Sequence, residues 1–330
     1  MQIMKKYFLF FAVTAFILSC DKKTDKNSNL KILPDSNGRI STLNVVVDNN
    51  LWEGAVGNAI RDSLAKPTEG LPQDEPVFNI SHLPPKTFSG FTTKGRNILI
   101  AQLGDENQFS MQENVYAKPQ KVVFVVGKTE SDLIHLIRQN SDKIIDNFKS
   151  GDVIETIRRI NKSLLSDKSL KDSLGIYLPL PTAYRYATKT KSFFWIRKTI
   201  QEGHMNIVTY ELPYRDFSNE QDVLNFVIKT RDSIGKERIP GPTDGSYLIT
   251  EEAYSPFINK DMLDGRTCWE TKGTWEVKGD FMAGPYVSYL IDDKTNKRLL
   301  VLEGFVFAPS ALKRDNVFEL ESILRSVKFL

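Results

Sequence analysis

Short runs of alternating aromatic and β-branched residues fill the second half of the chain, and they limit its fold more than any other feature. The runs cover residues 193–196, 207–210, 247–249, 267–270, 274–277, 287–291 and 299–307. Such period-two runs, separated by turn-forming residues, are typical of strands in an antiparallel sheet. Two helices are also predicted, beginning at the capping boxes Ser218-x-x-Gln221 and Asn316-x-x-Glu319. An antiparallel sheet packed by helices, including the C-terminal helix, therefore accounts for this half.

The first half of the chain instead mixes strands with helices. Strands are predicted at residues 43–47, 77–80, 98–103 and 121–126. Helices are predicted after the capping boxes Asn50-x-x-Glu53 and Thr129-x-x-Asp132. Apolar residues keep helical spacing as far as residue 165, with a helix break expected at Gly151.

Length and composition support a boundary between these halves. A chain of 330 residues suits about two domains, and a hydrophobic content of 41% is enough to form buried cores. The polar stretch 167–175 marks the junction. We therefore predict an α+β fold of two α/β-type domains, residues 40–166 and residues 176–330, the second a mainly antiparallel sheet packed by helices.

The first twenty residues resemble the signal peptide of a bacterial lipoprotein. Lys5 and Lys6 precede an apolar run over residues 7–18, which is too short to cross a bilayer as a helix. The run ends in Ile-Leu-Ser-Cys, similar to a lipobox, in which a signal peptidase cuts before the cysteine and its thiol is acylated. We expect a signal peptide over residues 1–19, a lipidated Cys20 carrying acyl chains such as palmitate, and a flexible tether over residues 20–39. An ordinary secretory peptide with an incidental cysteine is the alternative.

A lipid anchor at Cys20 would place the protein in the cell envelope, attached to a membrane. Several acyl chains hold a protein firmly on a bilayer. The outer membrane is favoured, although the mixed charges of residues 21–23 do not specify the leaflet. Once Cys20 is acylated, only Cys268 remains, so a disulfide within one chain is excluded.

The sequence predicts no catalytic residue, no metal site and no cofactor. A formal net charge of +3 argues against nucleic acid as a partner. Two cysteines and three histidines are too few for a four-cysteine zinc site, and His82, His135 and His204 are interpreted as structural. A phosphate-binding glycine loop, a serine nucleophile elbow and a calcium loop are all missing from the sequence.

Two rigid loops rich in aromatic residues are the candidate binding surface. Residues 239–247 hold two prolines and two glycines, and residues 273–286 bracket a tryptophan with turns. If both loops lie at one edge of the second sheet, they form a shallow cleft with an exposed tryptophan as its apolar anchor. The candidate binding residues are Trp275, Tyr247, Arg231, Asp232, Asp280 and Tyr286. Tight hairpin turns around a buried tryptophan are the alternative interpretation.

Three functions are compatible with these features. We expect a non-enzymatic binding or accessory module whose partner is an envelope protein, a glycan or a small ligand. The alternative is an envelope or glycan hydrolase, which needs a pair of carboxylates. The candidates for that pair are Glu251, Glu252, Asp261, Asp264, Glu270, Glu276 and Asp280. A purely structural lipoprotein without a small-molecule site is the third possibility.

Short residue strings along the chain carry a family resemblance. They are LPQDEPVF (71–78), FWIRK (194–198), RDSI (231–234), IPGP (239–242), GSY (245–247), GTWEV (273–277), LEGF (302–305) and AP (308–309). Together they resemble an uncharacterised lipoprotein family of the Bacteroidetes, catalogued as domain of unknown function 4837, over nearly all of the chain after the signal peptide. The resemblance implies an envelope lipoprotein with no established activity. Lys272 and Ala283 depart from the arginine and glycine expected in that family.

The lipobox gives a direct prediction for Cys20. The wild-type protein should partition with membranes and carry acyl chains on a mature N-terminus at Cys20, because the thiol is the lipid acceptor. The Cys20→Ala variant should stay soluble or uncleaved. Mass spectrometry of the mature N-terminus tests this, and an unmodified N-terminus at any other residue would contradict it.

Overall fold

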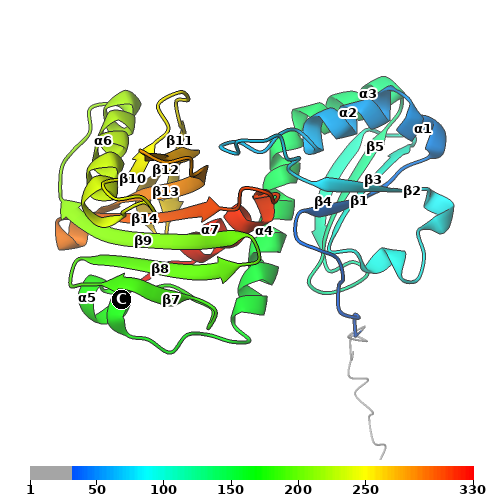
Figure 1. Cartoon of the computed structure of the whole chain (residues 1–330). Helices are drawn as coiled ribbons and strands as arrows, with labels where there is room; N and C mark the ends of the chain where they lie inside the picture. The colour runs from blue at the N-terminus through cyan, green and yellow to red at the C-terminus, as the bar shows by residue number, and fades with distance from the viewer. Residues whose placement is uncertain (1–31) are drawn as a thin grey trace, which may run out of the picture. The chain divides into compact units, whose positions relative to one another are not determined.

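The structure, a computed structural model, describes residues 32–330, of which residues 34–330 form one compact unit (Figure 1). The predicted signal peptide, Cys20 and residues 21–31 of the predicted tether lie outside the described residues. Near the described end of that tether, the Ser36 N–H donates to the Lys118 carbonyl at 3.1 Å and the Asn37 N–H to the Lys94 carbonyl at 2.8 Å. Residues 34–39 of the predicted tether therefore belong to the folded unit. Within residues 32–330, no helix has the length and apolar character needed to span a bilayer.

The first domain is a five-stranded sheet packed by four helices. The strands lie in the order β2-β1-β3-β5-β4, with parallel pairing except between β4 and β5. They are β1 (Thr42–Val46), β2 (Asn79–Leu83), β3 (Asn97–Leu103), β4 (Gln108–Glu113) and β5 (Lys121–Gly127). The helices are α1 (Asn49–Glu53), α2 (Ala55–Leu64), α3 (Glu130–Gln139) and α4 (Ser141–Ile160), with 3-10 turns η1 (Pro85–Thr87) and η2 (Thr92–Lys94). Apolar side chains of the helices and of one sheet face form a buried cluster.

The second domain is an antiparallel sheet, in the order β10-β12-β13-β14-β9-β8-β7 with β11 paired to β12. Its strands are β7 (Arg185–Lys189), β8 (Phe193–Ile200), β9 (Gly203–Pro213), β10 (Tyr247–Thr250), β11 (Phe257–Leu263), β12 (Arg266–Lys278), β13 (Ala283–Asp293) and β14 (Arg298–Phe307). The remaining elements are α5 (Ser169–Leu174), α6 (Glu220–Arg238), α7 (Arg314–Arg325), η3 (Lys294–Asn296) and the short pair β6 (Ile176–Tyr177) and β15 (Lys328–Phe329). The predicted α+β fold, with a mainly antiparallel second sheet packed by the C-terminal helix, is confirmed.

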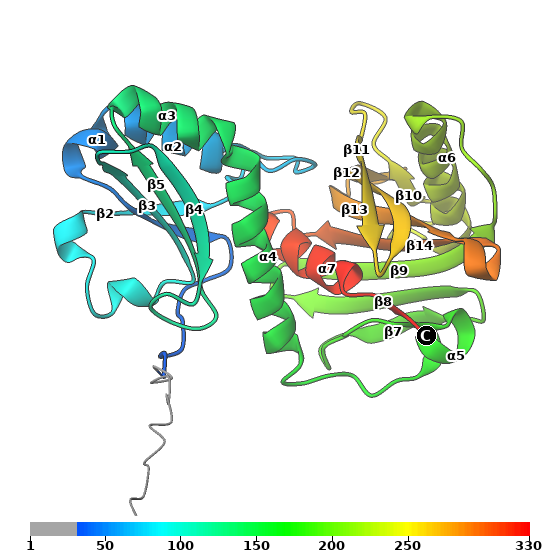
Figure 2. The same ribbon diagram turned by 180° about the vertical axis from the view of Figure 1, so that it is seen from behind.

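The two faces of the second sheet carry different helices. Figures 1 and 2 show α6 on one face and α7 on the other. Along β8, Phe193 and Trp195 belong to the apolar cluster that includes α6 side chains, whereas Phe194 and Ile196 belong to the cluster that includes α7 side chains. This alternation is the period-two pattern of the sequence. It also assigns Arg197, two residues after Trp195, to the α6 face.

Capping side chains fix where several helices begin. The predicted box Thr129-x-x-Asp132 is confirmed at the start of α3. The Asn50 box is wrong, because Asp48 is the N-cap of α1 and its Oδ1 accepts the Asn50 N–H at 3.0 Å. For α6 the predicted Ser218 cap is displaced by one residue, since the Asn219 side chain accepts the backbone N–H at the third helical position.

The start of α7 depends on a residue far away in the sequence. The helix begins at Arg314 and not at the predicted Asn316 box. Glu75 accepts the Lys313 N–H at 2.7 Å and the Arg314 N–H at 3.0 Å through its two carboxylate oxygens. A local capping pattern could not reveal this, because the cap lies more than two hundred residues earlier.

Two further expectations about the middle of the chain need revision. The predicted break at Gly151 is wrong, since α4 continues through it and a Cβ there would lie 2.9 Å from Lys121 Cγ. Glycine thus permits close packing of α4 on β5. The polar stretch 167–175 contains α5, whose Leu170 and Leu174 are buried in the core of the second domain. The boundaries 40–166 and 176–330 stay predictions.

A buried ion pair attaches α6 to the second sheet. Arg231 Nε and Nη2 donate to Glu303 Oε2 and Oε1 of β14, both at 2.8 Å, and Nη1 donates to Thr250 Oγ1 of β10 at 2.7 Å. The Arg231 and Glu303 side chains are only 2% and 5% exposed. Burial opposes the charged guanidinium, but the attraction of Glu303 outweighs it and holds the pKa of Arg231 above its usual value. Asp232 Oδ1 adds a second attachment by accepting the Thr250 N–H at 2.7 Å.

Removal of the Glu303 charge should destabilise the second domain strongly. Glu303→Gln leaves the Arg231 guanidinium buried without its counter-ion, so the free energy of unfolding should fall by about 3–5 kcal/mol. Glu237→Gln is the matched control, because Glu237 pairs with Arg238 on the exposed side of the same helix and should cost less than about 1 kcal/mol. Urea unfolding measures both, and equal losses would contradict the role given to the buried pair.

Candidate functional site

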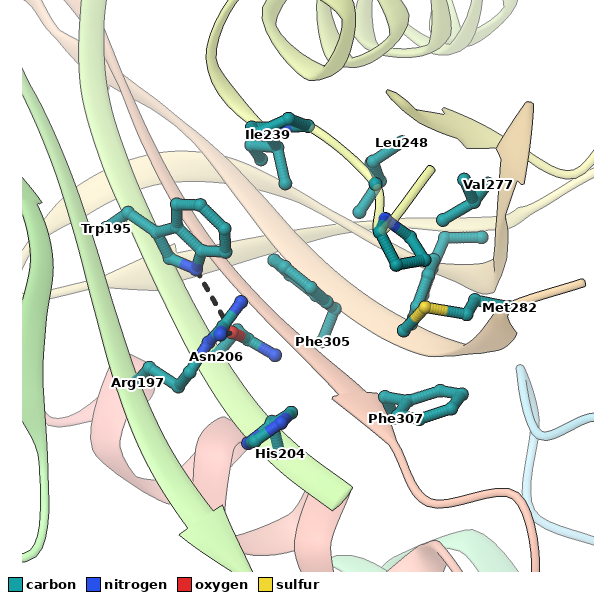
Figure 3. Close-up of a pocket in the computed structure, with 14 residues that line it drawn as sticks. Trp195, Arg197, His204, Asn206, Ile239, Leu248, Val277, Met282, Phe305 and Phe307 are labelled. Atoms are coloured by element: carbon teal, nitrogen blue, oxygen red, sulfur yellow. Dashed lines mark hydrogen bonds between the residues drawn. The ribbon is translucent and has the colours of Figure 1, made fainter. Parts of the chain in front are cut away.

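A cavity of about 370 Å³ opens on the α6 face of the second sheet, and this volume is within the usual range for small-molecule sites. Most of its lining is apolar, including Trp195, Trp275, Leu248, Met282, Phe305 and Phe307. Three polar side chains, Arg197, His204 and Asn206, complete it. Figure 3 shows Trp195 and the polar side chains on one side, with the aliphatic side chains and Met282 on the opposite side.

Two neighbouring strands place the polar side chains on one wall of the cavity. Trp195 and Arg197 lie two residues apart on β8, and His204 and Asn206 lie two residues apart on β9, so each pair shares a face of the sheet. Arg197 lies directly opposite Asn206 in the register of the two strands. Asn206 Oδ1 accepts hydrogen bonds from Trp195 Nε1 at 3.0 Å and from Arg197 Nε at 3.1 Å. This amide therefore holds both side chains in place.

Partial burial affects the protonation of this wall. Burial lowers the pKa of Arg197, whose guanidinium lies 4.6 Å from the centroid of the Trp195 ring. Burial, followed by the positive charge of Arg197, lowers the pKa of His204. Since the usual histidine pKa is already below 7, His204 is neutral at pH 7. The wall thus presents one guanidinium charge beside one neutral imidazole.

The loop between α6 and β10 forms the opposite rim. The Gly241 N–H donates to the Ser246 carbonyl at 2.8 Å, which closes the loop on itself. Thr243 Oγ1 donates to the Asp280 carboxylate, which joins this loop to the turn between β12 and β13. The two loops that the sequence analysis placed at one edge are therefore adjacent. The backbone bond within the first loop and the side-chain bond between the loops give the cavity a preformed rim.

Trp275 is a core residue whose side chain also reaches the cavity. It is 2% exposed, and its Nε1 donates to the Val306 carbonyl at 3.2 Å. Gly284 lies opposite Trp275 on β13, where a Cβ would lie 2.0 Å from the Val306 oxygen and 3.1 Å from Trp275 Nε1. Glycine is required there for the indole to reach Val306. Trp275 is therefore not the exposed anchor of a shallow cleft.

The other five predicted binding residues lie outside the lining of this cavity. Arg231 and Asp232 attach α6 to the sheet. Tyr286 is 1% exposed, with the Arg231 guanidinium 3.7 Å from its ring centroid. Asp280 binds the rim loop, and Tyr247 follows that loop on β10. These residues support the cavity without being placed to touch a ligand in it.

The carboxylates considered for hydrolysis are also absent from this cavity. None of the seven candidates lines it. Glu270, for example, accepts from Tyr289 Oη at 2.7 Å and forms ion pairs with Lys272 and Arg325. Within residues 32–330, no group of three or more His, Cys, Asp or Glu side chains is arranged to hold a metal ion. The cavity therefore offers apolar contact area and hydrogen-bond donors rather than an acid pair.

The sequence analysis did not predict the polar wall of the cavity, although it singled out the string that contains two of the residues beside it. Trp195 and Arg197 belong to the string FWIRK, and their two-residue spacing on a predicted strand puts them on one face. His204 was expected to be a structural residue in a turn, but it lies on β9 and lines the cavity. The missing information was the β8–β9 register, which brings Asn206 opposite Arg197.

The structure thus defines an α+β protein of two domains, the second with a largely apolar cavity. Residues 163–326 match the model of the family described as Domain of unknown function (DUF4837), and residues 36–161 match that of Domain of unknown function (DUF8532). The predicted membership of the DUF4837 family is confirmed for residues 163–326, which contain the cavity. The resemblance was expected over nearly all of the chain after the signal peptide, but the DUF4837 match does not include the string at residues 71–78, which falls in the DUF8532 match.

Solved structures give only distant likenesses. LpqN, involved in cell envelope biogenesis of Mycobacterium tuberculosis, matches at a TM-score of 0.29 and 14% identity, over 46% of this chain and 82% of its own. The Saccharomyces cerevisiae Ran-binding protein Mog1p matches at a TM-score of 0.32 and 11% identity, over 47% of this chain and 90% of its own. Neither likeness bears on function at these scores. A search of curated proteins found no match.

Truncation of Trp275 should reduce stability, as its burial implies. Trp275→Ala removes a large core side chain and should lower the free energy of unfolding by about 3–5 kcal/mol. Phe281→Ala is the control, because Phe281 is fully exposed on the adjacent turn and its loss should change stability by less than about 0.5 kcal/mol. Urea unfolding compares the variants, and a loss below about 1 kcal/mol for Trp275→Ala would show that Trp275 is not a core residue.

Proposed function

We propose that the DUF4837 domain is a non-enzymatic binding module that takes a small apolar or aromatic ligand. The observation that carries this proposal is the cavity of about 370 Å³, with its aromatic lining and its wall of donors. Largely apolar pockets with a few placed polar groups are the usual form of small-molecule sites. A glycan would need many more polar partners than Arg197, His204 and Asn206 supply.

The construction of the cavity favours binding, because little of it has to be ordered by a ligand. Trp195 and Arg197 are held by Asn206, and Trp275 by the Val306 carbonyl. Side chains already fixed in place lose little conformational entropy when a ligand arrives. Flat aromatic surfaces such as Trp195 and Phe305 also provide a large contact area for an aromatic ligand.

In this proposal the binding domain works at a membrane of the cell envelope, with the outer membrane favoured. The support is the lipobox at residues 17–20, which would leave Cys20 acylated. Residues 21–33 precede the compact unit, and a flexible tether of that length has a root-mean-square reach of roughly 20 Å, enough to hold the domain just clear of the lipid head groups. The protein partner of such an anchored domain would be another envelope protein, which delivers the ligand to the cavity or receives it from there.

Binding can be tested with a neutral, water-soluble probe, indole-3-acetamide. This probe has about 13 non-hydrogen atoms, and a binding free energy of about 0.3 kcal/mol for each of them corresponds to a Kd of about 1 mM or tighter. Isothermal titration calorimetry on the full chain in detergent, with a detergent-only blank, measures it. Met282→Trp should weaken binding at least about tenfold, because the indole would fill space beside the half-buried Met282 at the cavity wall.

Phe281→Trp is the matched control, one residue away and fully exposed. It should bind the probe as the wild type does. Absence of binding to the wild-type protein, or equal loss in both tryptophan variants, would contradict the cavity as the binding site.

A further inference from the structure

We infer that the cavity selects ligands that carry a carboxylate beside their apolar or aromatic body, with Arg197 and His204 as the receptors of the acid. This inference rests on the proposed binding function and specifies its ligand class. Its basis is the partly buried Arg197 guanidinium at the wall of an apolar cavity, which the described residues leave without a counter-ion.

Arg197 is the unneutralised charge. Its Nε donates to Asn206 Oδ1 at 3.1 Å, and this is its one hydrogen bond to the described residues. Burial lowers the pKa of Arg197, and no neighbouring acid within the described chain acts to raise it. The buried Arg231 of α6, which packs on the same face of the sheet, shows the contrast, because Glu303 accepts two of its hydrogen bonds. Arg197 therefore has two free guanidinium nitrogens at the cavity wall.

The neighbours of Arg197 do not supply the missing anion. Asn206 Oδ1 already accepts from both Trp195 and Arg197. On the other side, the residue opposite Arg197 on β7 is Arg185, a second cation, whose Nη1 donates to the Tyr184 carbonyl at 2.8 Å. Like charges directly opposite each other in a sheet are unfavourable unless an anion compensates them. A bound carboxylate would provide that compensation.

His204 supplies a second donor at the same wall. Its ring lines the cavity, and the neutral imidazole carries one N–H. Its Nδ1 is enclosed by protein atoms, so Nε2 is the nitrogen that can donate to an acceptor in the cavity. An oxygen of the ligand can accept this hydrogen bond while the acid neutralises Arg197.

The geometry of the guanidinium favours a carboxylate over other acceptors. Its two terminal nitrogens lie in one plane and can donate in parallel to the two oxygens of a carboxylate. The aromatic side chains Phe305 and Phe307 lie beside this polar wall (Figure 3). A ligand with its acid on Arg197 can therefore place its apolar part against them.

The test compares indole-3-acetate with indole-3-acetamide, which has nearly the same shape but no charge. Calorimetry on the full wild-type chain should show the acid binding about tenfold tighter or more, as expected for hydrogen bonds to a charged group. Arg197→Met should abolish this preference while binding of the amide persists. Arg197→Gln, which keeps a donor for Asn206, serves as a second variant if the methionine variant fails to fold.

Lys278→Met is the control for a general loss of positive charge, because Lys278 is exposed on β12 and outside the cavity. It should keep the full preference for the acid. Equal binding of acid and amide by the wild type would overturn this inference and leave the proposed function intact. An equal loss of preference in Lys278→Met would also overturn it, and failure of both probes to bind would refute the proposed function itself.

Discussion

The ion pair between Arg231 and Glu303 is the interaction on which the second domain depends. It joins the middle of α6 to β14, and through Thr250 it also holds β10. The loop that forms the cavity rim begins where α6 ends and finishes where β10 begins. Its position is therefore set by the same pair. A close approach reinforces it, since a Cβ at Gly235 of α6 would lie 2.0 Å from the Leu248 carbonyl oxygen.

Arg231 of α6 and Arg197 of β8 lie on the same side of the second sheet but differ in their partners. Arg231 is buried and fully paired, so removal of its partner costs stability. Arg197 is only partly buried, and its terminal nitrogens lack a protein acceptor among the described residues. Partial burial removes part of the hydration of the Arg197 guanidinium, which lowers its pKa. In the inferred site, a bound carboxylate would provide the counter-ion that Arg197 lacks.

The sequence predicted the fold well because the relevant signals are local. The alternation of Phe193 to Ile196 gave the strand and its two faces, and Thr129 with Asp132 gave the start of α3. The cap that Glu75 provides for α7 could not be predicted, because it joins residues distant in the chain. The cavity was only partly predicted for the same reason. The rim loop was predicted from its composition, although Trp275 was wrongly expected to be exposed. The wall of Arg197, His204 and Asn206 depends on strand register, which the sequence does not show.

Ligand binding between the polar wall and the rim loop can be tested at individual residues by NMR, because each tryptophan indole N–H gives its own resonance. The chain has four tryptophans, of which Trp195 and Trp275 line the cavity and Trp52 and Trp269 do not. A titration of the nitrogen-15-labelled chain with indole-3-acetate, assigned through single Trp→Phe variants, should shift the resonances of Trp195 and Trp275 alone. Shifts confined to Trp52 or Trp269, or no shift at saturating probe, would contradict the account.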